Sequence, residues 1–156
     1  MSKDPVIKLI KAYVIGVVLF FLLLFLGAKT CSGQIKKHIA PAAAVFVSGG
    51  FEGVMDHLQF HYDGNNQFWQ PDISWKNKYK NGDPSQGKTF RGKYLVFTTD
   101  GWHLMKFGRN LSLFTGFAIY SGTFQKGKKW YWYAIEGLSY WAINRLGFNV
   151  TYNLLK

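Results

Sequence analysis

The sequence predicts an all-α membrane protein with an N-terminal transmembrane helix followed by about three helical segments. Three observations support this: a long uncharged apolar stretch near the N-terminus, later apolar stretches of helical length, and aromatic residues that make up 19% of the 156 residues. Aromatic side chains fill cores, but they also gather at membrane–water interfaces. A chain of this length fits one domain plus an anchor. We therefore expect an anchor at 1–30 and a helical, aromatic-rich, membrane-associated domain at 31–156.

The predicted anchor is the uncharged sequence AYVIGVVLFFLLLFLGA at 12–28. Its 17 residues lie near the lower limit for crossing a hydrocarbon core of roughly 30 Å. Apolar residues at 6–10 lengthen the segment if Lys8 and Lys11 extend their charges towards the headgroups. A retained transmembrane helix is the favoured interpretation. Lipid attachment at Cys31 and removal as a signal peptide, which usually has a shorter apolar region, are the open alternatives.

The rest of the chain alternates between apolar stretches and polar turns. A helix is predicted over 41–61, with Pro41 in its first turn and small residues such as Gly49 and Gly53 that would admit a second helix at close range. Further helical stretches are expected over 93–107, 111–124 and 130–155, with a break at 108–110. The polar segment 63–92 is rich in turn residues and is expected to be a loop outside the hydrocarbon. Four tryptophans are expected at the membrane interface: Trp69, Trp75, Trp130 and Trp132.

The positive charge of the chain points to an anionic partner. Nineteen lysines and arginines against eight acidic residues give a formal net charge of +11. Such a surface attracts nucleic-acid phosphates or anionic lipid headgroups. The lysines occur in short groups (36–37, 76–80 and 126–129), which favours loops beside a bilayer over a nucleic-acid-binding tail. We expect a lipid bilayer with anionic lipids as the partner; protein partners in a membrane assembly or capsid, and homo-oligomers, remain open.

Several ionisable residues lie inside apolar helical stretches, where an unpaired charge is costly. Asp100 and His103 are three residues apart and would share one face of a helix. If two helices pack antiparallel, the polar residues Glu52, Asp56, His61, Asp100 and His103 could converge. Such a cluster suits general acid–base catalysis, or a divalent metal held by His61, Asp100 and His103. The alternative is that these residues pair with one another and only fix how the helices pack.

The sequence contains no established catalytic motif. It has no His-Glu-x-x-His, no Gly-x-Ser-x-Gly and no phosphate-binding glycine loop. Its single cysteine excludes an intramolecular disulfide. Whether the protein is an enzyme therefore stays open.

Three segments resemble small uncharacterised membrane proteins of Bacteroidota and their phages, some of which carry a phage structural protein label. They are 49–61, which begins Gly-Gly-Phe-Glu-Gly, Ser-Trp-Lys-Asn-Lys-Tyr at 74–79 and Thr-Asp-Gly-Trp-His at 99–103. More distantly, 100–103 followed by Glu-Gly-Leu-Ser at 136–139 and Asn-Arg-Leu-Gly at 144–147 is similar to the YfiM-like lipoproteins. The resemblance implies a membrane or envelope setting.

Two functions follow as expectations. The first is a membrane-anchored structural or interaction protein of a bacterial envelope membrane or of the internal membrane of a lipid-containing phage virion. The alternative is a membrane-embedded hydrolase, metal- or acid/base-dependent, that acts on lipid or envelope substrates.

Overall fold

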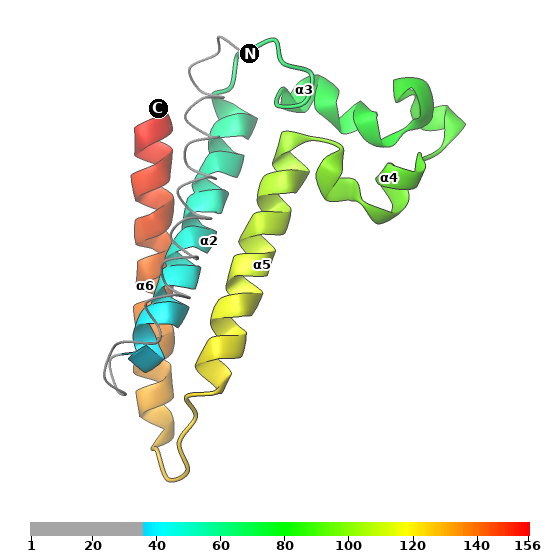
Figure 1. The fold of residues 1–156 in the computed structure, drawn as a ribbon. Coiled ribbons are helices and arrows are strands. Elements are labelled where there is room, and N and C mark those ends of the chain that lie inside the picture. The colour runs from blue at the N-terminus through cyan, green and yellow to red at the C-terminus, as the bar shows by residue number, and fades with distance from the viewer. Residues whose placement is uncertain (1–35) are drawn as a thin grey trace.

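The computed structural model of this chain describes residues 36–156, which are built from three long helices and a small side lobe. The long helices are α2 (Lys36–Phe60), α5 (Gly101–Ser121) and α6 (Trp130–Leu155). In Figure 1, α2 lies between the other two, antiparallel to α5 and parallel to α6. The all-α prediction is confirmed for this part of the chain. The predicted anchor at 1–30 and Cys31 lie outside the described residues.

Within 36–156, no helix combines the length and the apolar character that a membrane span needs.

The core is centred on α2, which is enclosed along most of its length. Val54 and Leu58 are almost fully buried, and Met105 of α5 packs in the same cluster. Burying each such side chain contributes about 1.5–3 kcal/mol. The core therefore ties the second half of α2 to the start of α5.

Small residues let α2 and α6 approach backbone to backbone. A Cβ atom added at Gly49 would lie 1.9 Å from the Asn144 carbonyl oxygen, and one added at Gly147 would lie 2.0 Å from the Phe46 carbonyl oxygen. A Cβ atom added at Gly53 would likewise lie 2.8 Å from the Phe148 carbonyl oxygen. The predicted close packing against the glycines of 41–61 is thus confirmed, and its partner is α6.

The segment 63–92, predicted as a polar loop, folds together with the residues up to Thr98 into the side lobe, a series of short helical turns (Figure 1). These are α3 (Pro71–Ser74), η1 (Trp75–Lys78), η2 (Lys80–Gly82), η3 (Pro84–Gln86), α4 (Phe90–Tyr94) and η4 (Val96–Thr98). An isolated antiparallel bridge between Tyr79 and Lys88 closes the lobe. Asn81 adopts a φ of 52°, a turn conformation that asparagine tolerates better than most residues.

Three predicted helix boundaries were wrong. The stretch 93–107 is divided between α4, η4 and α5, and residues 108–110 do not interrupt α5. Gly108 lies under the Phe51 ring, where a Cβ would be 2.8 Å from the ring carbon Cζ. This packing outweighs the helix propensity cost of a glycine, about 1 kcal/mol. Pro41 lies inside α2 rather than in its first turn, because the helix begins at Lys36.

Candidate functional site

Asp100 and His103 form a close pair at the start of α5. Asp100 is the N-cap residue, and its carboxylate accepts a 2.9 Å hydrogen bond from the His103 backbone N–H. The same carboxylate lies 2.9 and 2.7 Å from His103 Nδ1 through its two oxygens. The pair that the sequence predicted is therefore formed, but through a helix cap and not along one helix face.

The surroundings of Asp100 hold its carboxylate in one orientation. Its side chain is 2% exposed, and the Thr99 hydroxyl lies 3.1 Å from Oδ2. Next to it, Gly101 packs against Trp69 and donates its backbone N–H to the Phe68 carbonyl oxygen at 2.8 Å. A carboxylate only accepts hydrogen bonds, so Nδ1 carries the His103 proton, and Nε2 of a neutral ring is an acceptor.

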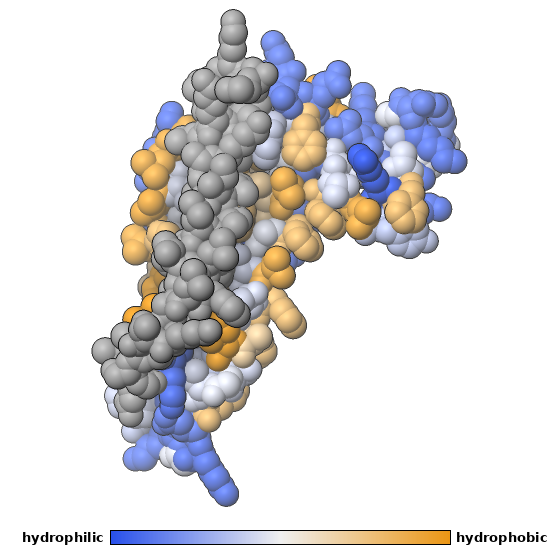
Figure 2. Space-filling view, in the orientation of Figure 1, coloured by the Kyte–Doolittle hydropathy of each residue, from blue (hydrophilic) through white to orange (hydrophobic). Residues whose placement is uncertain are grey.

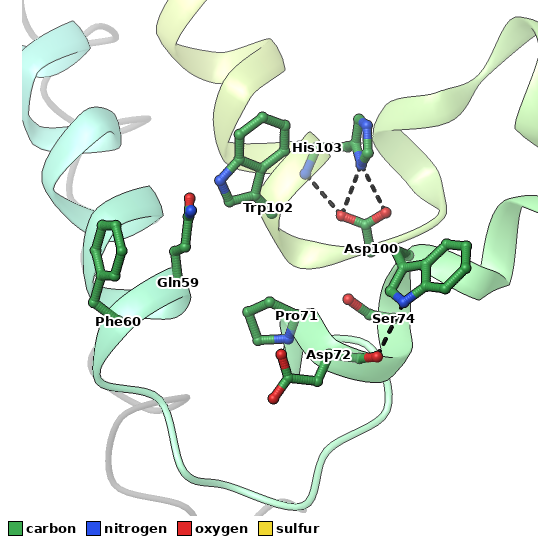
Figure 3. A pocket seen from close by; sticks show the side chains of 9 residues that line it. Gln59, Phe60, Pro71, Asp72, Ser74, Asp100, Trp102 and His103 are labelled. Atoms are coloured by element: carbon green, nitrogen blue, oxygen red, sulfur yellow. Dashed lines mark hydrogen bonds and ion pairs between the residues drawn. The ribbon is translucent and has the colours of Figure 1, made fainter.

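A pocket of about 490 Å³ opens beside this pair. Figure 3 shows it between the end of α2, α3 and the start of α5. Its lining residues are Gln59, Phe60, Pro71, Asp72, Ser74, Trp75, Asp100, Trp102 and His103. An oriented imidazole in a pocket is one part of an acid–base site.

A second set of polar side chains connects all three long helices. Glu52 of α2 accepts from Arg145 of α6 at 2.9 Å and lies 3.5 Å from Arg109 of α5. Asn144 adds a 3.2 Å hydrogen bond to the Val45 carbonyl oxygen. These contacts fix how α5 and α6 pack on α2, which is the role that the alternative interpretation of the sequence gave to the polar residues.

Asp56 and His57 lie about one turn further along α2 than Glu52, and His61 directly follows the last residue of that helix. Burial and the nearby Glu52 raise the pKa of Asp56, with Arg145 acting the other way. Burial and His61 lower the pKa of His57, whose two ring nitrogens are buried and have no hydrogen-bond partner within 36–156. His61 lies 2.5 Å from the Tyr152 hydroxyl of α6.

The five candidate residues do not form one cluster. Glu52 pairs with arginines and His61 with a tyrosine, while Asp100 pairs with His103. Within 36–156, no group of three or more histidine, cysteine or acidic side chains is placed to hold a metal ion. The predicted metal ligands His61, Asp100 and His103 are therefore not brought together, because Asp100 and His103 lie at the lobe end of α5 and His61 turns to α6.

The four predicted interfacial tryptophans have different surroundings. Trp69 is 8% exposed and belongs to the core, so its interfacial assignment was wrong. Trp75, Trp130 and Trp132 are at the surface, and Trp130 is 79% exposed.

The exposed apolar side chains of α5 and α6 include Trp130 and Trp132, which were predicted at an interface, together with residues that the sequence analysis did not single out. We call them the outer apolar surface: Phe107, Leu111, Phe114, Phe117 and Ile119 on α5, and Trp130, Trp132, Ile135, Leu138, Trp141, Leu146, Val150 and Leu154 on α6. Figure 2 shows hydrophobic residues along α5 and on the part of α6 that is in view, with hydrophilic residues at the lobe and at the α5–α6 loop. The two charged side chains within α6, Glu136 and Arg145, are both paired, with Lys128 and Glu52. Helical periodicity could have separated the two faces of α5, where the exposed residues 107, 111 and 114 recur at intervals of four and three.

Comparisons of the chain with protein-family models, with curated proteins and with solved structures found no match.

Proposed function

We propose that this chain is a structural membrane protein, held in a bilayer by its N-terminal apolar segment and by the outer apolar surface. The observation that supports it is the distribution of polarity between the inside and outside of the helices. Glu52, Arg109 and Arg145 join the helices on the inside, while Phe114 and Leu138 are 70% and 68% exposed on the outside. In water, extensive exposed apolar surface usually marks a site of contact with a membrane or another protein.

Lipid accounts for this arrangement physically. In a bilayer the outer side chains lose no hydrophobic free energy, and polar residues pair on the inside of the bundle. Helices in lipid also commonly approach one another closely at small residues, as α2 and α6 do at Gly49 and at Gly147. The setting that we propose is a bacterial envelope membrane or the internal membrane of a lipid-containing phage virion, where the protein contacts lipid and other proteins of the assembly.

Spin labelling tests the proposed lipid contact. The full chain with Cys31→Ser would carry a single label at Phe114→Cys or Leu138→Cys in phosphatidylcholine vesicles. Oxygen, which concentrates in hydrocarbon, should relax both labels more strongly than a water-soluble nickel complex does. Ser85→Cys in the polar side lobe is the control, and nickel should dominate there. Nickel accessibility at Phe114 and Leu138 equal to that at Ser85 would overturn the proposal.

An acid–base hydrolase is the second candidate function, supported by the Asp100–His103 pair in its pocket. Two substitutions separate the candidates. Asp100→Asn keeps a good N-cap, whereas Asp100→Ala removes it at a cost of about 1 kcal/mol. A structural protein should tolerate Asp100→Asn and lose stability with Asp100→Ala. An enzyme that needs the carboxylate should lose turnover of a lipid ester with both.

A further inference from the structure

The loop between α5 and α6 forms a basic hollow at one end of the outer apolar surface. A pocket of about 540 Å³ opens there, and its walls include Lys126, Lys128, Lys129, Tyr131, Trp132 and Glu136. Gly127 turns the loop with a φ of 87°, a conformation that most other residues avoid. The three lysines are thereby gathered around one pocket.

The charges of the hollow are not balanced. Its one lining carboxylate, Glu136, already pairs with the Lys128 ammonium and accepts a 2.7 Å hydrogen bond from the Tyr120 hydroxyl. Burial raises the pKa of Glu136, but these partners lower it by more, so the carboxylate stays ionised and neutralises Lys128. Among the described residues, neither Lys126 nor Lys129 forms an ion pair with a carboxylate. Two cations therefore remain for an anion.

The position of the hollow indicates what kind of anion fits. Trp132 lines the pocket and is half exposed, and Ile135 and Leu138 continue the outer apolar surface along α6. Tryptophan and lysine next to an apolar surface are the composition of a membrane interface. A ligand that fits both parts has a phosphate group for the lysines and acyl chains for α6.

We propose that this basic hollow binds the phosphate of an anionic phospholipid, with its acyl chains against the outer apolar surface of α6. The inference rests on the proposed membrane location and adds a specific lipid site to it. Lys126 and Lys129 hold the phosphate, while Trp132 lies beside the glycerol region. Zwitterionic lipids bind less well because their headgroups carry a compensating positive charge.

Native mass spectrometry of the full chain in neutral detergent tests the site. The protein is mixed with equal amounts of phosphatidylglycerol and phosphatidylcholine, and the ratio of the bound lipids is measured. The variant Lys126→Gln with Lys129→Gln should lose the preference for phosphatidylglycerol by about twenty-five-fold, since each lysine near an anionic headgroup contributes a factor of about five. The matched control is Lys80→Gln with Lys88→Gln, which removes the same charge from exposed lysines of the side lobe.

Each outcome has a definite meaning. A pocket variant that keeps the wild-type lipid ratio would overturn the proposal, and so would an equal loss in the control, because the attraction would then be diffuse. If excess inorganic phosphate abolishes the preference, the site binds free phosphate and the lipid assignment is wrong. The spin-label test in pure phosphatidylcholine is independent of these results, so failure of the lipid site and failure of the membrane location are distinguishable.

Discussion

Gly147 lies where the backbones of α6 and α2 nearly touch, so Gly147→Ala probes the packing of these two helices. The added Cβ would lie 2.0 Å from the Phe46 carbonyl oxygen and 2.9 Å from its carbonyl carbon. Both are backbone atoms, so no side-chain rotation relieves the clash. Real Cβ contacts are essentially never shorter than 3.0 Å, which requires a shift of at least 3.0 − 2.0 = 1.0 Å.

The cost of this shift can be estimated from the contacts it changes. Overpacking typically costs about 1–3 kcal/mol. The neighbouring hydrogen bond from Asn144 to the Val45 carbonyl oxygen is 3.2 Å long and would be stretched beyond bonding distance, a further loss of about 0.5–1.5 kcal/mol. Alanine regains about 1 kcal/mol of helix propensity. We therefore expect a net destabilisation of about 0.5–3.5 kcal/mol.

Unfolding of the full chain in detergent micelles, followed by circular dichroism, measures this effect. Gly137→Ala is the control, because Gly137 lies on the same helix and no atom of the described part of the chain lies within 4 Å of its added Cβ. That variant should be stabilised by up to about 1 kcal/mol. If Gly147→Ala is as stable as Gly137→Ala, the close approach of α2 and α6 is refuted.

Three further predictions follow from the polar contacts. Asp100→Ala should destabilise the chain by about 1 kcal/mol and Asp100→Asn by less, in the same unfolding assay, because only alanine removes the cap of α5. A double-mutant cycle of Glu52→Gln and Arg145→Gln should give a coupling of about 0.2–1 kcal/mol, the range for partly exposed ion pairs, since the Arg145 side chain is 40% exposed. A coupling near zero would contradict a structural role for that ion pair. Burial lowers the pKa of His57 below its ordinary 6.5 in the folded chain. As the pH falls, His57 is therefore protonated in the unfolded chain before it is protonated in the folded one. The stability that the neutral ring provides is complete above about pH 6.5 and declines as the pH falls further. The loss between about pH 7 and pH 5 should be smaller in His57→Leu, and an identical loss would contradict this assignment.

Local sequence signals predicted part of the candidate site. Asp100 and His103 were expected together because they are three residues apart, and they do meet, at 2.7 Å. The geometry differs because Asp100 caps α5 instead of lying within it. The cap was not predicted because the many apolar residues of 93–107 suggested one continuous helix, without the turn at η4 that precedes Asp100.

Contacts over long sequence separations could not be predicted in this way. Glu52 meets Arg145 across 93 residues, and His61 meets Tyr152 across 91. Which partner each charge takes depends on the order and direction of the packed helices, and no local pattern specifies that. For the same reason the expected convergence of Glu52, Asp56 and His61 with Asp100 and His103 did not occur.

The sequence alone determined the all-α class and the small-residue face around Gly49, because apolar periodicity and residue size are local properties. Only the tertiary structure decided that α2 becomes the central helix, with the apolar residues of α5 and α6 directed outwards. The physical reason is that α2 offers both close approach through Gly49 and Gly53 and a carboxylate, Glu52, for two arginines. Once these contacts use the inward faces of α5 and α6, side chains such as Phe114 and Leu138 remain on the outside.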